Sequence, residues 1–343
     1  MKRPVPWAPP VAGFVAAGAL PAALILVGAM LGGGWIWAAL IWIALAGPAA
    51  DTAIARALGQ AAGPQPGESA GLAVLALCHL AVLATAVAAL TGHELTTAER
   101  VALFMAAGMY CGQVGHAVAH ELIHSGSRHL FRLGAAVYVS LLFGHHVSAH
   151  RLVHHVHVAT DADPNSARKG EGFWRFVSRA WVGSFRAGMA AERSLSARRA
   201  GRINPYVWWI GGGVACVALV ALIAGPSGLA DYLGICLYAQ LQILLSDYIQ
   251  HYGLRRRIGA DGRAEPVGPH HAWDSPHPIS SLTLVNAPRH ADHHMNPLRP
   301  YSPLRLGDAP MLPYPVAIMG ALAMVPPLWR RIMDRRVEKM HRA

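Results

Sequence analysis

The chain has 343 residues, of which 54% are hydrophobic and 14% are charged, and its formal net charge is +11. The apolar residues form long uninterrupted runs, which exclude an ordinary water-soluble protein and indicate an integral membrane protein. The basic residues flank these runs without a nucleic-acid-binding motif around them, so they indicate membrane topology and no nucleic-acid partner.

Six apolar segments are predicted to cross a bilayer as helices, since about 20 residues span its hydrocarbon core. Residues 4–50 carry no charged side chain, exceed the core of a signal peptide, and are expected to form two helices that turn at Gly32–Gly34. Thr96 and Glu99 form a capping-box pattern before the fourth segment. The predicted spans cover residues 11–31, 35–48, 70–90, 101–124, 205–224 and 229–248.

A further apolar segment, residues 130–147, is also long enough to cross. A crossing there would move the arginine-rich stretch 151–202 to the face opposite Lys2–Arg3 and Arg255–Arg257, which the positive-inside rule opposes. We therefore expect this segment to lie along the membrane or re-enter it. Six crossings then place all three basic regions on the cytoplasmic side of the inner cell membrane.

Two other segments are predicted to lie at the membrane surface. Residues 173–190 mix aromatic residues with arginines, as interfacial amphipathic helices do. Residues 311–329 are apolar but broken by four prolines, which favours a short docking element over a span. With no separate soluble region apparent, the fold class predicted is an all-α integral membrane protein that forms a single domain over residues 1–343.

Glycines recur in the fourth span at Gly108, Gly112 and Gly115. Small residues in a membrane helix either permit close helix packing or leave a lateral opening for a lipid-soluble ligand. The sequence leaves both interpretations open.

The twenty histidines are the clearest anomaly, because a membrane protein avoids buried ionisable groups that have no function. They cluster in HELIH at residues 120–124, HRLVHH at 150–155 and RHADHH at 289–294, and His251 ends the sixth span on the same side. Steps of three and four residues direct such rings to one helix face. Neutral imidazole suits iron, copper, zinc and nickel, and eight or nine rings can fill the shells of two such ions.

Taken alone, HELIH also fits the H-E-x-x-H pattern of a zinc protease, with Glu121 as general base. Three clusters argue against this, because such a protease needs only three ligands. Metal-bound histidines normally donate their other ring nitrogen to a carboxylate or carbonyl group. The candidates for that role are Glu121, Asp161, Asp163, Asp247, His271, Asp274 and Asp292.

The histidine motifs resemble those of the membrane alkane hydroxylases, or alkane 1-monooxygenases, a family related to xylene monooxygenase and to the membrane fatty acid desaturases and hydroxylases. The resemblance is carried by HELIHS from residue 120, HRLVHHVHVATDADPNSAR from 150, DYIQHYGLRR from 247 and NAPRHADHHMNPLRPYSPLR from 286. It implies a cytoplasmic, histidine-rich cap that holds two non-haem iron ions. The implied ligands are His120, His124, His150, His154, His155, His251, His290, His293 and His294.

The sequence departs from the family pattern at a few positions. Ala149 stands where the family usually has an acidic residue, which removes a possible partner of His150. Ile123 replaces a glycine and would alter the fit of the substrate if it faced the substrate. Ala287–Pro288 replaces a Leu-Gln pair.

The resemblance further implies an enzyme, an O2-dependent monooxygenase that converts a medium- or long-chain n-alkane to a primary alcohol. The chain has no cysteine cluster for an iron-sulfur or rubredoxin centre and no G-x-G-x-x-G fingerprint, so two electrons must come from an external carrier. By resemblance this carrier is a rubredoxin or ferredoxin with its reductase, and Arg255, Arg256 and Arg257 are candidates for docking it.

Three alternatives remain open. Histidine clusters of this kind also occur in fatty-acyl or carotenoid desaturases and hydroxylases. An alkyl-aromatic monooxygenase of the xylene type is a further alternative. A histidine-rich metal transporter belongs to a different class, and it predicts ligands near the middle of the bilayer rather than at helix ends.

Overall fold

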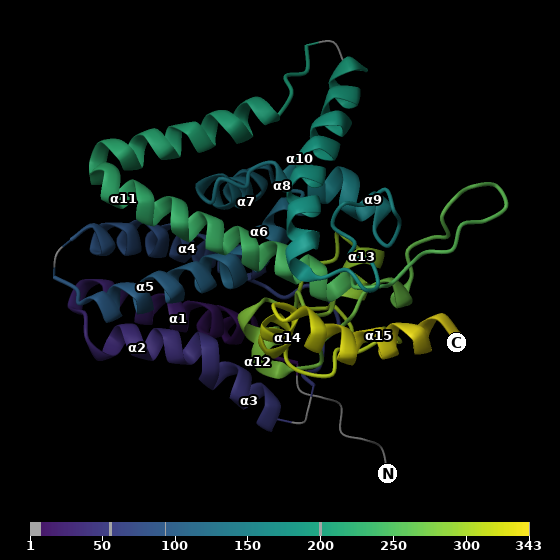
Figure 1. Cartoon of the computed structure of the whole chain (residues 1–343), viewed down its shortest axis with the longest axis horizontal. Coiled ribbons are helices and arrows are strands. Elements are labelled where there is room, and N and C mark those ends of the chain that lie inside the picture. The colour runs from purple at the N-terminus through teal and green to yellow at the C-terminus, as the bar shows by residue number, and fades with distance from the viewer. Residues whose placement is uncertain (1–7, 55–56, 93, 199–200, 343) are drawn as a thin grey trace.

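The computed structural model describes residues 8–54, 57–92, 94–198 and 201–342, so Lys2 and Arg3 lie outside the described residues. Within these ranges the chain forms helices joined by loops and two isolated β-bridges, with no named strand. Helices α1 (Val11–Leu31), α4 (Glu68–Thr91), α5 (Thr97–Tyr110) and α11 (Tyr206–His251) run roughly side by side. The shorter helices of the histidine-rich region gather at one end of this bundle (Figure 1).

Five helical segments are long and apolar enough to cross a membrane: Val11–Leu31, Gly34–Ala53, Glu68–Thr91, Thr97–Ile123 and Tyr206–His251. The second combines α2 (Gly34–Ile41), a π-helical turn η1 (Trp42–Ala46) and α3 (Gly47–Ala53), and so ends five residues later than predicted. The fifth has 46 residues and is bent at Gly225, where φ is 64° and ψ is −168°. Each arm of α11 on either side of this bend is long enough to be a span of its own.

The turn between the first two helices depends on glycine. Gly32 and Gly33 have φ values of 65° and 62°, a backbone region that residues with a Cβ rarely adopt. The Gly33 amide donates a hydrogen bond of 2.7 Å to Oε1 of Glu99. The other carboxylate oxygen of Glu99 accepts from the amide of Thr96 in a complete capping box, so this carboxylate joins the turn to the start of α5.

The segment predicted to re-enter the membrane forms a short helix and a return. Helix α7 (Arg128–Ser140) has 13 residues and rises about 20 Å, which is too short to cross a hydrocarbon core of about 30 Å. It packs on α6 (His116–Ile123), and its last residue, Ser140, lies 3.1 Å from Nε2 of His79 in the middle of α4. The chain then returns toward the histidine-rich end through α8 (His146–Ala149).

The glycines of the fourth span serve helix packing. A Cβ atom at Gly108 would collide with Tyr238, and one at Gly112 would collide with Gln242 and Ala239 of α11. The backbone of Gly115 in the π-helical turn η2 (Cys111–Gly115) lies equally close to His79. These contacts bring α4, α5 and α11 together, and they favour the packing interpretation of the glycines over a lateral opening.

The remaining helices surround the histidine-rich end. They are η3 (His150–His154), α9 (His155–His157), α10 (Phe173–Ala197), η4 (Pro269–His271), α12 (Pro278–Thr283), α13 (His290–Met295), α14 (Val316–Ala323) and α15 (Pro326–Arg342). The segment predicted as a short docking element forms α14 and the start of α15, which begins at Pro326. Helix α15 buries Trp329, Met333 and Val337. The ring of Trp329 packs on Tyr248 of α11 and on Tyr252, which directly follows that helix.

Candidate metal centre

Four separate stretches of chain bring nine histidines together at one end of the helical bundle. The end of α6 supplies two, the turns η3 and α9 supply three, the last residue of α11 supplies one and α13 supplies three. The five-histidine group contains His120, His124, His150, His155 and His293. The four-histidine group contains His154, His251, His290 and His294. In each group the ring nitrogens lie within 4.8 Å of one another.

The spacing of the ring nitrogens fits metal coordination. In the five-histidine group, Nε2 of His150 lies 3.1 Å from Nε2 of His124 and 2.9 Å from Nε2 of His155. In the four-histidine group, Nε2 of His290 lies 2.9 Å from Nε2 of His251 and 3.0 Å from Nε2 of His294. Two nitrogens that bind one ion at about 2.1 Å and at right angles would lie about 3.0 Å apart. Each group therefore has room for one ion at its centre.

Buried ring nitrogens without partners support the same interpretation. Both nitrogens of His120 and Nε2 of His154 are buried and have no hydrogen-bond partner in the described part of the chain. An unsatisfied polar atom in a protein interior is costly, and a bound cation would remove that cost. The residues present therefore fit a metal site of two ions, one in each group.

A π-helical turn aligns the second cluster. In a regular α-helix, His155 would point about 140° away from His150, because five residues exceed one turn of 3.6. The π-helical turn η3 spans His150 to His154 and widens the turn locally. His150 and His155 consequently share the five-histidine group, while His154 joins the other. The H-x-x-x-H-H spacing was the available sequence signal for this π-helical turn, although sequence reasoning did not predict it.

Asp163 orients His154. Its carboxylate accepts a hydrogen bond of 2.8 Å from Nδ1 of His154, and it also accepts bonds from the Ser166 hydroxyl and the Asn165 amide. Burial opposes the charged form of both groups, but their interaction raises the pKa of His154 and lowers the pKa of Asp163. With Nδ1 held in this way, Nε2 of His154 is free to bind a metal ion. Asp247 extends the network, since its carboxylate accepts a bond of 2.5 Å from the side chain of Asn165.

The other candidate partners occupy different places. Nδ1 of His251 lies 3.2 Å from the carbonyl oxygen of His271, so that residue contributes its backbone. Oε1 of Glu121 lies 3.7 Å from Nδ1 of His120 and 4.0 Å from Nδ1 of His293. Asp274 accepts a bond of 2.8 Å from the backbone amide of Ala291 and so positions the start of α13.

Two of the predicted carboxylates lie apart from the ligand rings. Asp292 forms an ion pair of 2.6 Å with Arg299 and accepts a bond from the amide of Arg305, which anchors the loop after α13. The side chain of Asp161 is 79% exposed and pairs with Arg168 and Arg255. Both Asp161 and Asp163 follow the second histidine cluster closely in the sequence, so their positions alone did not show which of them contacts a histidine. Burial decides this, because Asp163 is buried and Asp161 is exposed.

The positions that depart from the family pattern are packed within the fold. Ala149 is buried, and its backbone lies against Gly188 of α10, which leaves little space for a longer side chain. Ile123 is fully buried, and its side chain lies close to Gly134 of α7. It is absent from the described residues that line the neighbouring cavity.

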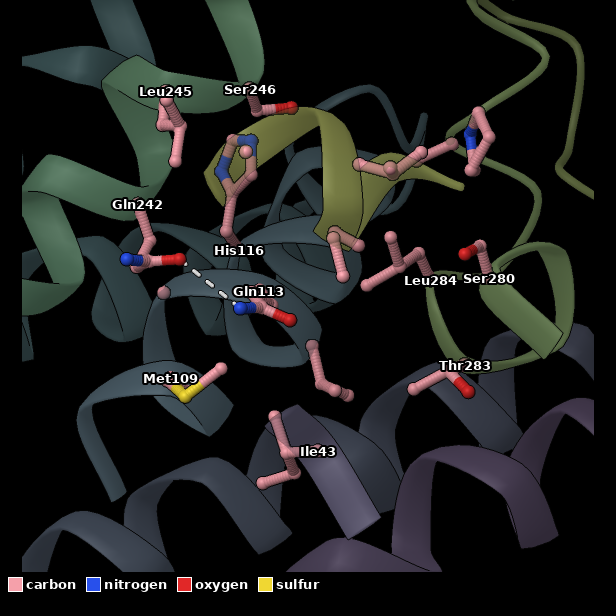
Figure 2. A pocket seen from close by; sticks show the side chains of 18 of the residues that line it. Ile43, Met109, Gln113, His116, Gln242, Leu245, Ser246, Ser280, Thr283 and Leu284 are labelled. Atoms are coloured by element: carbon pink, nitrogen blue, oxygen red, sulfur yellow. Dashed lines mark hydrogen bonds between the residues drawn. The ribbon is translucent and has the colours of Figure 1, made fainter. Parts of the chain in front are cut away.

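A cavity of about 390 Å³ reaches the histidines from within the helical bundle. Most of its walls come from η1, α3, α5, η2, α6, α11, α12 and α14. His120, His150 and His290 line it together with His116. Most of the lining is apolar, as Ile43, Met109, Leu245 and Leu284 illustrate in Figure 2. A volume of this size suits a small hydrophobic ligand. Sequence reasoning missed this cavity, because its walls come from distant segments.

His116 and His146, which carried no ligand assignment, pack beside the five-histidine group. Nδ1 of His116 lies 2.9 Å from the hydroxyl of Tyr138, and the ring of His146 stacks on that of His150 at 5.2 Å between centroids. Neither belongs to the two groups of converging nitrogens.

Comparison with known proteins gives one family and several relatives. The family model described as fatty acid desaturase matches residues 98–317. Alkane 1-monooxygenase 2 of Alcanivorax borkumensis is 34% identical over 236 residues, which cover 66% of this chain and 62% of that protein. Alkane 1-monooxygenase 1 of Pseudomonas aeruginosa is 34% identical over 243 residues, covering 69% and 64%. The xylene/toluene monooxygenase hydroxylase component of Pseudomonas putida is 28% identical over 225 residues, covering 62% and 57%. The chain thus spans slightly less than two thirds of the length of these curated relatives.

Proposed function

Because the chain belongs to the fatty acid desaturase family, we propose that it is a membrane-embedded, non-haem diiron monooxygenase that hydroxylates a hydrophobic substrate. Since its relatives are named alkane 1-monooxygenases, the proposed substrate is an n-alkane, which we take to be of medium or long chain, and the product is a primary alcohol. The observation that carries this proposal is the junction of an apolar cavity with the two histidine groups.

The proposed ligands of the two ions are the nine histidines of the two groups. Iron bound there would supply the O2 activation and the oxidising power that cleavage of an unactivated C–H bond requires, as cofactors do in such enzymes. The chain itself supplies the geometry. Asp163 and the carbonyl of His271 hold the rings of His154 and His251 with Nε2 facing inward.

The apolar cavity binds and orients the substrate in this proposal. His120, His150 and His290 belong to both the ligand set and the cavity wall, so a substrate carbon at that end lies next to the metal centre. The surrounding side chains, such as Met109 and Leu245, bury the rest of the hydrocarbon and exclude water from the reacting end. Holding the substrate carbon next to the metal centre replaces a bimolecular encounter and so lowers the activation barrier of the reaction.

Electrons are proposed to come from a rubredoxin or ferredoxin that docks near the basic residues after α11. Arg255 pairs with Asp161 at 3.3 Å, and Arg256 donates to the carbonyls of Glu265 and Val156, so both are tied into the structure. Arg257 is exposed and is the best of the three for an intermolecular contact with an acidic carrier.

For the topology we propose six crossings, with α11 contributing one on each side of its bend and the metal centre on the cytoplasmic face of the inner membrane. The test is a membrane-impermeant thiol reagent applied to intact cells that carry Asp261→Cys, an exposed position in the loop after α11. The reagent should modify this cysteine only after the cells are opened. Labelling of intact cells would overturn the orientation.

A second candidate function is hydroxylation or desaturation of another hydrophobic substrate, such as an alkyl-aromatic compound or a fatty acyl group. It is favoured by the family description and by the xylene/toluene monooxygenase relative. Anaerobically purified protein, assayed for metal content and then supplied with O2, donor and either octane, xylene or an acyl substrate, separates the candidates. We expect two irons per chain and octanol as product. Exclusive reaction with the acyl substrate would overturn the alkane proposal.

A further inference from the structure

A pair of amide side chains stands inside the apolar cavity. Nε2 of Gln113, in η2, donates a hydrogen bond of 3.1 Å to Oε1 of Gln242, in α11 (Figure 2). Both side chains line the cavity. Polar side chains inside a membrane helix bundle are costly and usually serve a function or join helices.

If the two amides served only to join the helices, most of their hydrogen-bonding groups would have no purpose. A primary amide has an oxygen that accepts and two N–H groups that donate, yet each of these two amides makes a single side-chain hydrogen bond among the described residues. The oxygen of Gln113 points into the open part of the cavity in Figure 2. Gln250 differs, since its amide bonds both Ser246 and the carbonyl of Ala287.

The charge of the lining restricts the chemistry of a polar ligand. No lysine or arginine lines the cavity in the described part of the chain, whereas Asp51 and Asp247 do. A carboxylate would therefore be buried without a cation beside it, which is strongly unfavourable. A hydroxyl group is neutral and both donates and accepts, so it matches what the amide pair leaves free.

The position of the pair sets a length for this ligand. Gln113 precedes His120 by seven residues, which is about 10 Å along a helix. An extended carbon chain with bonds of about 1.5 Å and angles near 111° advances about 1.25 Å per bond, so about eight bonds cover this distance. A chain of eight to ten carbons would place one end at the metal centre and the other at the amides.

We propose that Gln113 and Gln242 bind the hydroxyl of a medium-chain primary alcohol, whose far methyl group is hydroxylated to give an α,ω-diol. This inference rests on the proposed function and narrows its substrate class. In the reaction, one atom of O2 enters a terminal C–H bond and the other leaves as water. The external carrier supplies two electrons, and solvent supplies two protons.

The experiment compares decane with decyl alcohol, using iron-loaded protein and its variants Gln113→Met and Gln242→Met, which keep side-chain length without the amide. The matched control is Thr283→Val, which removes a hydroxyl from another wall of the same cavity. Wild-type kcat/KM should be higher for the alcohol. Each glutamine variant should lower the ratio of kcat/KM for decyl alcohol to kcat/KM for decane about three- to tenfold, as the loss of one hydrogen bond does. Thr283→Val should leave the preference unchanged.

Equilibrium binding of the two ligands to metal-free wild-type protein gives a second readout that needs neither turnover nor a variant. Tighter binding of the alcohol supports the inference. Equal binding of decane and decyl alcohol would overturn the inference, and so would a preference for the alcohol that survives in both glutamine variants. Hydroxylation of decane by the wild-type enzyme would still support the proposed function in either case. Failure of the iron-loaded enzyme to hydroxylate either compound would overturn the proposed function instead.

Discussion

Replacement of Asp163 by asparagine should weaken one metal site selectively. The carboxylate accepts bonds from Nδ1 of His154, from the Ser166 hydroxyl and from the Asn165 amide, all within 3.0 Å. Asparagine keeps the shape but removes the charge that fixes the tautomer and raises the basicity of His154. Loss of such a partner of a metal-bound histidine typically costs 10- to 100-fold in affinity, or about 1.4 to 2.8 kcal/mol.

The assay is a chelator titration of purified protein with metal content measured at each step. Wild-type protein should lose its two ions at higher chelator concentration than Asp163→Asn, and the variant should release the ion of the four-histidine group first. Asp161→Asn is the matched control, because Asp161 lies two residues away but is exposed and contacts arginines rather than a histidine. If both variants released metal like wild type, the assigned role of Asp163 would be refuted.

Three further predictions concern other parts of the chain. Arg257→Glu should reduce turnover with an acidic electron-donor protein at low salt, because the exposed arginine is proposed to contact that donor. Turnover with a small chemical reductant should change little. If the variant and wild type turned over equally fast with the donor protein, the proposed docking site would be wrong. Ala149→Glu should destabilise the protein by about 2 kcal/mol or more, because it would place a carboxylate at a buried position. An unchanged melting temperature would contradict that burial. Arg179 donates two bonds to Glu171, so Arg179→Ala should lower the free energy of unfolding at neutral pH by about 2 kcal/mol, which is measured as a lower melting temperature. Burial raises the pKa of Glu171, but the hydrogen bonds from Arg179 outweigh it and lower this pKa overall. The stabilisation from the ion pair should therefore disappear as the pH falls below 4.5. If Arg179→Ala destabilised the protein equally in acid, the ion pair would not be the cause.

The parts of the fold that follow from local chemistry were predictable from the sequence. The capping box at Thr96 and the turn at Gly32–Gly33 occur where the residue patterns place them. The histidine clusters also stood out, because ionisable residues at the ends of apolar helices are rare unless they have a function. The nine rings that converge in the two groups are the ones that the family resemblance implied as ligands.

Other features depend on contacts between distant segments and had no local signal. Gln113 and Gln242 are separated by 129 positions, and their pairing needs η2 and α11 to pack through Gly112. The cavity likewise needs α3, α11 and α14 to surround the same space. The difference between buried Asp163 and exposed Asp161 arises from how one loop folds, since both residues are aspartates in a single short stretch.

The most direct test of the central claim is the position of the metal ions in the purified protein. An anomalous difference map collected at the iron absorption edge should show two peaks, one within the five-histidine group and one within the four-histidine group. A single peak shared by all nine histidines, or strong iron peaks remote from them, would contradict the proposed diiron centre.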